Sequence, residues 1–340
     1  MSSCTCIICR FLVIIILGDF MKKFRYLIIY LLLLLSPIYV FAYDKVIPGG
    51  ETIGIEVHSK GILVVGFYKV NNRLIGKDSG FKIGDIITRV NNRNVSDINS
   101  MIREIDNSSG KCTFNVLRNG KRRDISMKLI NEDSTFKSGL YVKDQINGLG
   151  TLSFISPDKK FGGLGHEIME SNTLTKFQIS EGEIYDASVN GIIKSYNGQA
   201  GEKNATYEKD TVTGIITEND TTGIYGTYNG DVDDRSYVSV GDASSIKLGD
   251  AYIRTVIEGN KVEEFLINII SIDNKDETKN ILFEIVDERL LNATGGVVQG
   301  MSGSPIMQDD KIIGVVNYVI VNDPTKGFGI FIDRMLKEIE

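Results

Sequence analysis

The chain has 340 residues, of which 42% are hydrophobic and 24% are charged. This composition is typical of globular proteins, and the length allows more than one folded unit. The 38 basic and 44 acidic side chains give a net charge of −6, and no local run of Lys and Arg outweighs that balance. Nucleic acid is therefore not an expected partner.

Residues 1–42 have the pattern of an export segment. The basic stretch from Met21 to Arg25 directly precedes an apolar run that begins near Tyr26, which is the order of an export signal. The run is short for a membrane span, and Val-Phe-Ala at its end has the small-x-Ala form that a signal peptidase can cut. A cleaved signal and an uncleaved membrane anchor both stay open.

Residues 1–20 look like an upstream extension, so translation could start at Met1 or at Met21. Three of the four cysteines lie in this extension, and only Cys112 would stay in an exported chain. A single cysteine forms no internal disulfide, and the sequence lacks the paired spacing of a zinc site. We therefore expect no disulfide, no metal ion and no cofactor.

Residues 55–132 predict a small module of strands with one or two helices. The segments GILVVGFYKV and GFKIGDIITRVNNRNV predict two strands with turns between them. Apolar residues from Ile98 to Ile105 then follow at the spacing of one helical face. Asn119-Gly120 predicts a hairpin turn between two further strands.

This order, with GFKIGDIITRVNNRNV at its centre, resembles a PDZ domain of the bacterial protease-associated kind. The resemblance implies that an extended peptide adds beside one strand and that backbone amides hold its terminal carboxylate. We place this peptide-binding site at Gly61, Ile62, Leu63 and Val64. A packing module without a ligand is the alternative.

Residues 139–340 predict a second, mainly β domain. Short β-type runs such as GIIKSY, DTVTGIIT and KIIGVVNYVIV are separated by Gly, Asn, Asp and Thr. Many short strands with turn signals between them favour a sandwich or a barrel. The last residues, from Asp333 to Glu340, predict a closing helix.

The segment GMSGSP, residues 300–305, contains the candidate nucleophile Ser302. A serine between glycines can lie on a tight turn with its hydroxyl exposed, and the amides of Gly300 and Ser302 can then converge on one point. An oxyanion hole requires this geometry. The pattern resembles the nucleophile loop of chymotrypsin-like peptidases, Gly-x-Ser-Gly-x-Pro, although a structural turn would also explain it.

A serine hydroxyl needs a base to take its proton, and the usual base is histidine. The chain has two. His58 precedes the PDZ-like module and is expected outside the β-rich domain. His166 ends the glycine-rich segment FGGLGH inside that domain, so we assign His166 as the general base.

The third catalytic group is expected to be a carboxylate that fixes the imidazole tautomer. Asp287 ends the apolar run ILFEIV, fifteen positions before Ser302, although a solvated charge would explain it equally well. Spacing alone does not choose among the eight candidates, which are Asp231, Asp233, Asp234, Asp242, Asp250, Asp273, Asp276 and Asp287.

The segments GTLSFISPDKKFGGLGHEI and FEIVDERLLNATGGVVQGMSGSPIMQDDKIIGVVNYVIVNDPTKGFGIFID resemble the family of stage IV sporulation protein B, the SpoIVB serine peptidases. The resemblance runs from about Lys45 to the C-terminus. It implies a chymotrypsin-like, β-barrel-type peptidase domain with His166 as base, Asp287 as orienting acid and Ser302 as nucleophile.

The resemblance also implies a cellular role. It implies a spore-forming bacterium and export into the space between the two forespore membranes, with the N-terminal segment at the membrane. It further implies self-cleavage near the N-terminus and cleavage of a membrane-bound regulator, which releases processing of a late sigma factor. The alternative from another class is a non-catalytic PDZ scaffold that signals by binding a membrane partner.

Two residues depart from the expected patterns. Met301 stands where chymotrypsin-like enzymes have an acid that forms a buried ion pair on activation. Glu167 follows the histidine, where a small residue is expected. Met301 fits the sporulation family, whereas Glu167 bears on how a substrate fits.

Overall fold

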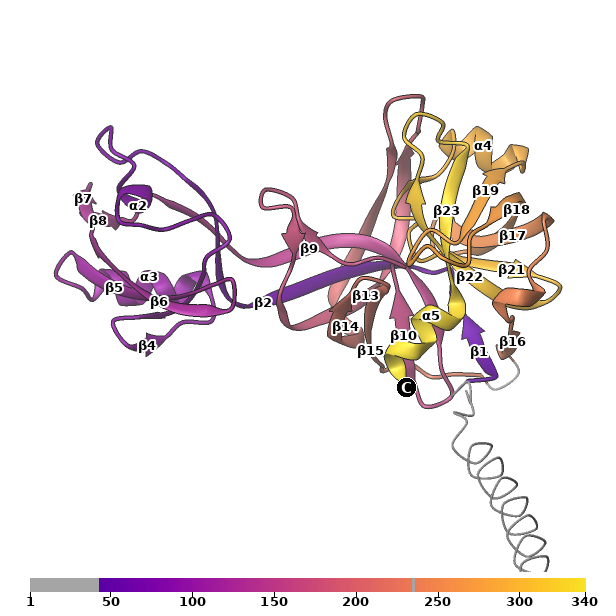
Figure 1. Ribbon diagram of the computed structural model, residues 1–340, viewed down its shortest axis with the longest axis horizontal. Helices are drawn as coiled ribbons and strands as arrows, with labels where there is room; N and C mark the ends of the chain where they lie inside the picture. The colour runs from indigo at the N-terminus through magenta and orange to yellow at the C-terminus, as the bar shows by residue number, and fades with distance from the viewer. Residues whose placement is uncertain (1–42, 234–235) are drawn as a thin grey trace, which may run out of the picture. The chain divides into compact units, whose positions relative to one another are not determined.

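A computed structural model describes residues 43–233 and 236–340 (Figure 1). The predicted export segment, residues 1–42, lies outside the described residues. Within the described ranges, none of the helices has the length and apolar character needed to cross a membrane. The described chain is mainly β, as the sequence predicts.

The first half of the β structure is a closed circuit of six antiparallel strands, called here the first circuit. Its strands alternate in burial as a half-buried sheet requires: in β13 the side chains of Tyr185, Ala187 and Val189 are buried, and those between them are exposed. In order of pairing, the strands are β2 (Thr52–Phe67), β9 (Leu140–Ile155), β10 (Lys160–Gly163), β15 (Gly223–Tyr228), β14 (Gly201–Asp220) and β13 (Ile179–Ile193), which pairs again with β2.

A second circuit of six antiparallel strands follows. It encloses its own core, in which Phe265, Phe283 and Met301 are fully buried. In order of pairing, the strands are β17 (Gly249–Val256), β18 (Val262–Ile272), β19 (Ile281–Ile285), β23 (Lys326–Phe331), β22 (Lys311–Val319) and β21 (Pro305–Gln308), which pairs again with β17.

Short strands join the two circuits. β20 (Val298–Gln299) runs parallel to the start of β14 and leads into the serine loop. β1 (Lys45–Pro48) pairs with β9 and with β16 (Val238–Val240), and β16 pairs with β22. The region just after the predicted export segment is therefore part of the β-rich fold.

The PDZ-like module has its own core, which is built around Phe81, Phe114 and Met127. The Asp97 side chain caps helix α3 by accepting from the Ser100 amide. Its elements are α2 (Ile75–Asp78), β3 (Ile86–Val90), β4 (Arg93–Asn94), α3 (Ile98–Asp106), β5 (Lys111–Arg118), β6 (Lys121–Lys128), β7 (Ile130–Glu132) and β8 (Thr135–Lys137).

The long strands β2 and β9 belong to both parts of the chain. Residues 52–58 of β2 pair with residues 145–151 of β9 inside the first circuit. Residues 63–67 then pair with residues 140–143, beside β3 of the PDZ-like module. The PDZ-like module is therefore an insertion between two neighbouring strands of the first circuit.

This insertion corrects the prediction for His58. The sequence predicts that His58 lies outside the β-rich domain. In the structure, His58 pairs with Glu181 of β13 and with Gln145 of β9, so it lies inside that domain. The predicted boundary at residue 55 falls inside β2. The continuous apolar run after Gly61 hides the fact that one strand serves two sheets.

The remaining elements are short. The predicted closing helix is present and begins one residue early, at Ile332. It consists of α5 followed directly by a turn of 3-10 helix. These elements are β11 (Met169–Glu170), β12 (Thr175–Lys176), η2 (Ala243–Ser245), α4 (Glu288–Thr294), α5 (Ile332–Leu336) and η3 (Lys337–Ile339).

Candidate active site

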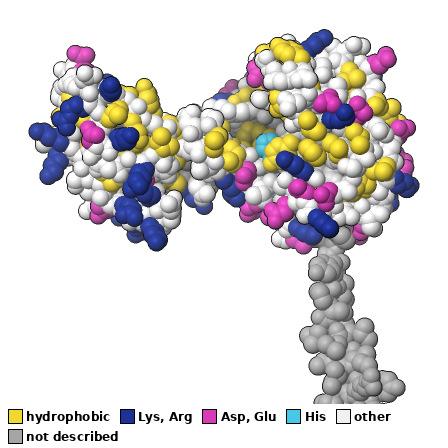
Figure 2. Space-filling model, turned by 45° about the horizontal axis from the view of Figure 1, so that its top comes forward, with side chains coloured by type: hydrophobic (Ala, Val, Ile, Leu, Met, Phe, Trp, Pro, Cys, Tyr) yellow, Lys and Arg dark blue, Asp and Glu magenta, His cyan; other side chains and the backbone are white. Residues whose placement is uncertain are grey.

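His166 and Ser302 line the same pocket, which has a volume of about 530 Å³. Gly300, the other residue predicted for the oxyanion hole, also lines this pocket. Figure 2 shows hydrophobic side chains gathered around a hollow in which a histidine is visible. The apolar lining residues are Ile55, Ile146, Leu149, Leu164, Ile168, Met169, Val297, Val298 and Val319.

The Ser302 loop depends on glycines on either side of the serine. Gly300 has φ +93° and Gly303 has φ +101°, a region that side chains with a Cβ disfavour. A Cβ on Gly303 would also lie 2.0 Å from the carbonyl oxygen of Thr151. The sequence motif is therefore a backbone requirement of this turn.

Contacts from Thr151 and Asn317 fix the loop. The Thr151 amide donates to the Ser302 carbonyl at 3.0 Å, and the Thr151 hydroxyl donates to the Gly300 carbonyl at 2.7 Å. The Ser302 hydroxyl donates to the backbone carbonyl of Asn317 at 3.2 Å. Met301, which replaces the expected acid, is fully buried in the core of the second circuit. Its packing there holds the turn against that core.

His166 is held by a turn that follows β10. Leu164 and Gly165 both have φ +69°, and the half-buried imidazole lies with its ring centroid 5.7 Å from that of Tyr318, in a stacked arrangement. Burial lowers the pKa of His166, although the Glu167 backbone and carboxylate oppose the shift. The imidazole is therefore neutral at neutral pH, as a general base must be.

A backbone carbonyl fixes the tautomer of His166. Its Nδ1 lies 2.9 Å from the carbonyl oxygen of Glu167. Because a carbonyl oxygen can only accept a hydrogen bond, Nδ1 carries the proton and Nε2 has a free lone pair. Nε2 is therefore the nitrogen that can take a proton from a serine.

Asp287 has other partners in this structure, and its catalytic role stays a prediction. It does not line the pocket. Its carboxylate caps helix α4 by accepting from the backbone amides of Arg289 and Leu290, and it pairs with the Arg289 side chain at 3.0 Å. Burial raises the pKa of Asp287, but hydrogen bonds from Arg289 and from backbone amides outweigh burial and lower it.

The other candidate acids that the structure describes are also outside the pocket. Asp242 caps η2, while Asp273 and Asp276 accept backbone amides in the turn before β19. Asp234 lies outside the described residues. Among the described residues, Glu167 is the only acid that lines the pocket.

His58 lies away from this pocket, with Nε2 3.4 Å from a carboxylate oxygen of Glu56. Its side chain is 41% exposed, and it neighbours no serine of the nucleophile loop. Of the two histidines, the structure brings only His166 to Ser302.

Sequence reasoning missed several residues that shape the site, and no motif marks them. Asn219 holds the segment after His166, because its amide accepts from the Ile168 amide and donates to the carbonyls of Ile168 and Phe177. Thr151 and Asn317 hold the serine loop. They are ordinary strand residues in sequence, and only the pairing of distant strands brings them to the serine loop.

The predicted peptide-binding residues lie in the part of β2 that pairs with β3 and β9. Leu63 pairs on one side with Ile86 of β3 and on the other with Lys143 of β9. Ile62, Leu63 and Val64 are also buried. Leu63 also lines a pocket together with Ile83 and Gly84, so the peptide-binding role of this stretch stays a prediction. Residues 61–64 of the run GILVVG are buried, and the last two are half-buried.

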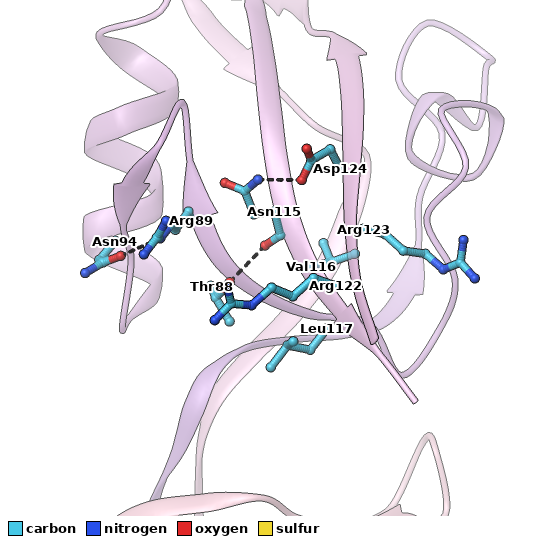
Figure 3. Close-up of a pocket in the computed structure, with 9 residues that line it drawn as sticks. All are labelled: Thr88, Arg89, Asn94, Asn115, Val116, Leu117, Arg122, Arg123 and Asp124. Carbon is cyan, nitrogen blue, oxygen red and sulfur yellow. Dashed lines mark hydrogen bonds between the residues drawn. The ribbon is translucent and has the colours of Figure 1, made fainter. Parts of the chain in front are cut away.

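The PDZ-like module has a pocket lined by residues of β3, β4, β5 and β6, shown in Figure 3. Arg89 donates to Asn94 at 2.8 Å, and Asn115 donates to Asp124 at 2.6 Å. The residues that line this pocket include no serine, cysteine or histidine. Its full lining is Thr88, Arg89, Asn94, Asn115, Val116, Leu117, Arg122, Arg123 and Asp124.

One acidic group in the described chain has the spacing of a metal site. Oxygens of Glu218, Asp220 and Glu338 lie within 4.8 Å of one another. Lys176 already pairs with Asp220 at 3.2 Å, and none of the three acids lines the active-site pocket. The pocket itself contains no cluster of metal ligands.

Comparisons with known proteins show the family of the chain. Residues 134–336 match the family model of the SpoIVB peptidase S55, and residues 52–129 match the PDZ domain. The chain is thus a serine peptidase that carries a PDZ domain. The peptidase model covers more than half of the sequence, and the chain belongs to the SpoIVB peptidase S55 family.

Solved structures resemble the chain only distantly. The active form of the Rv3671c protease from M. tuberculosis has 15% sequence identity and a TM-score of 0.32, over 57% of this chain and 73% of that one. The HtrA-type protease AlgW with decapeptide has 11% identity and a TM-score of 0.32, over 62% of this chain and 57% of that one. No curated protein matches the chain.

Proposed function

We propose that the chain is a chymotrypsin-like serine endopeptidase in which Ser302 is the nucleophile and His166 the general base. The observation that carries this proposal is the shared pocket of His166, Gly300 and Ser302. In this proposal the two closed circuits of six strands are the two barrels of such an enzyme.

The proposed reaction begins with proton transfer from Ser302 Oγ to His166 Nε2 while Oγ attacks the carbonyl carbon of a peptide bond. The amides of Gly300 and Ser302 hold the resulting oxyanion. The imidazolium then gives its proton to the leaving amine as the C–N bond breaks. Water, deprotonated by the same imidazole, releases the acyl group from Ser302.

The Ser302 hydroxyl must turn from its present partner to reach the base. It donates to the Asn317 carbonyl at 3.2 Å, which is a weak contact for an O–H donor. Catalytic hydrogen bonds are often long or misaligned before substrate binds. The carbonyl of Glu167, rather than Asp287, holds the imidazole in the required tautomer in this proposal.

We further propose that the enzyme acts in sporulation signalling. It would cleave itself near the N-terminus and cleave a membrane-bound regulator, so that a late sigma factor is processed. It would be exported to the space between the forespore membranes, either tethered by residues 1–42 or released. Membership of the SpoIVB peptidase family and the PDZ match support this role.

The test of catalysis is to express residues 43–340 and treat them with a fluorophosphonate probe. Mass spectrometry should find the probe on the peptide that contains Ser302, together with self-cleavage fragments. Ser302→Ala should show neither. A folded wild-type chain that takes up no probe and produces no fragments would favour a non-catalytic PDZ scaffold instead.

A further inference from the structure

Lys203 is a buried lysine beneath the serine loop. It lies on β14, and only 3% of its surface is exposed. Its Nζ donates to the hydroxyl of Thr255 at 2.9 Å and to that of Thr52 at 3.3 Å. Thr52 belongs to β2 of the first circuit and Thr255 to β17 of the second, so one side chain links the two circuits.

The aliphatic part of Lys203 packs against Gly300. A Cβ placed on Gly300 would lie 3.2–3.4 Å from the Cβ, Cγ and Cδ atoms of Lys203. The carbonyl of the same glycine accepts the hydroxyl of Thr151 at 2.7 Å. Thr151 thus holds the carbonyl oxygen of Gly300 by a hydrogen bond, and the methylene chain of Lys203 packs against the Gly300 backbone.

This lysine has no charged partner among the described residues. Glu51 and Arg254 stand next to its two threonine partners in the sequence, but neither is bonded to its amine. Arg254 instead contacts Gly49 and Glu264. Burial alone lowers the pKa of Lys203 to about 7, so the fold works against the charged form of its amine.

An unpaired lysine in this position costs stability. In the unfolded chain the amine has its ordinary pKa of 10.5, so it stays protonated up to about that pH. Between pH 7 and 10.5 the unfolded chain therefore holds a proton that the folded chain does not, and the free energy of unfolding rises with pH across this window. An apolar side chain of similar length would avoid this cost.

We propose that Lys203 is a positioning residue for the serine loop: its bonds to Thr52 and Thr255 hold its methylene chain under Gly300 and so fix the Gly300 amide where the oxyanion forms. The inference rests on the proposed peptidase function. Lys203 does not touch the pocket. It acts through Gly300. In this proposal the buried lysine lowers the free energy of unfolding but holds the oxyanion site in a more rigid position.

The test compares fluorophosphonate labelling of Ser302 in the full chain, in three single variants and in one double variant. Lys203→Met keeps the chain length and removes the amine. Thr255→Val keeps the volume and removes one of its partners. Lys209→Met makes the same substitution at an exposed position on the same strand and is the matched control.

We expect Lys203→Met to lower the maximal labelling rate roughly tenfold to a hundredfold, because small misplacements of a catalytic group have effects of this size. The probe concentration for half-maximal rate should change by less than about threefold, since the oxyanion contact forms only in the transition state. Thr255→Val should lower the rate in the same way, and adding it to Lys203→Met should have little further effect. Lys209→Met should match the wild type.

Stability separates positioning from a merely structural role. Lys203→Met should lose the rise in unfolding free energy between pH 7 and 10.5 and should be at least as stable as the wild type at pH 7. A Lys203→Met protein that labels within about twofold of the wild type overturns the proposal. A Lys203→Met protein that loses both stability and labelling also overturns the proposal, because its role would then be merely structural. A folded wild-type chain that is not labelled at Ser302 overturns the peptidase function itself, and the proposal with it.

Discussion

Ser302 Oγ lies 3.2 Å from the carbonyl oxygen of Asn317, so the predicted nucleophile is bonded to the last part of β22. Two residues further on, Ser304 is fully buried, and its Oγ has no hydrogen-bond partner among the described residues. Only Ser302 of this pair lines the pocket. The two serines of the same motif therefore have different surroundings and should respond differently to substitution.

Ser302→Ala should abolish labelling and proteolysis, because loss of a nucleophile removes several orders of magnitude in rate. Ser304→Ala should leave most of the activity and should not lower stability, since it removes a buried hydroxyl that has no partner. Labelling rates and thermal melting of the two variants provide the measurement. Equal loss of labelling in both would exclude the assignment of Ser302.

The pH dependence of labelling should follow His166. Burial lowers its pKa from the ordinary value of 6.5, so the neutral imidazole persists below that pH and the rate should fall only at pH values under about 6.5. His166→Ala should remove activity, and His58→Ala should keep both the rate and the profile. A rate that already falls on acidification at pH values above 6.5 would argue against this buried imidazole as the base.

Asp287 should act on helix α4 and not on the imidazole. Asp287→Asn keeps an oxygen that can cap the helix but loses the ion pair with Arg289, and we expect a loss of about 1 kcal/mol or less in unfolding free energy. The pH profile of Ser302 labelling should stay that of the wild type, because the Glu167 carbonyl fixes the tautomer of His166.

Asp276→Asn is a suitable comparison for this prediction, since its carboxylate also accepts backbone amides outside the pocket. Circular dichroism would establish that both variants fold. A folded Asp287→Asn protein whose labelling collapses, while Asp276→Asn is active, would restore Asp287 as the orienting acid that the family resemblance implies.

The serine loop could be predicted from sequence because its motif is a set of local backbone requirements. Gly300 and Gly303 adopt φ values that favour glycine, and they flank the serine in the sequence itself. The mainly β class was equally accessible, since alternating burial follows directly from alternating residue types. Both features depend on residues that are close together in the chain.

Other features depend on contacts between distant residues. Asp287 ends a strand, but it also begins a helix, and Asp before Glu-Arg-Leu is a good N-cap sequence. Spacing from Ser302 could not show in which direction its carboxylate points. Lys203 has no motif at all, because its partners Thr52 and Thr255 come from strands far away in the sequence.

The insertion of the PDZ-like module was hidden for the same reason. β2 is one unbroken strand of 16 residues, yet its two halves pair in different sheets. A sequence pattern records that a strand exists but not which partner each half takes. The predicted boundary at residue 55 therefore cuts through pairs that belong to the peptidase fold.

The insertion leads to a specific deletion. Removing residues 61–142 and joining Lys60 to Lys143 through Asn-Gly should close β2 and β9 into a simple hairpin, because this dipeptide suits a two-residue turn. Lys143 should be kept, since its amine lies 2.6 Å from a carboxylate oxygen of the buried Glu170. We expect the shortened chain to fold and Ser302 to label at a rate within about tenfold of the wild type.

The matched control removes residues 55–132, and this deletion should unfold the first circuit. It takes away the part of β2 that pairs with β13, including the pairs of Ile55 with Ile184 and of Val57 with Gly182. Thermal melting and fluorophosphonate labelling of both deletions would be compared with the full chain. If the 61–142 deletion folds but no longer labels at Ser302, the PDZ-like module supports the active site itself. If it labels normally but cleaves a protein substrate differently, the module governs access of substrates to the pocket.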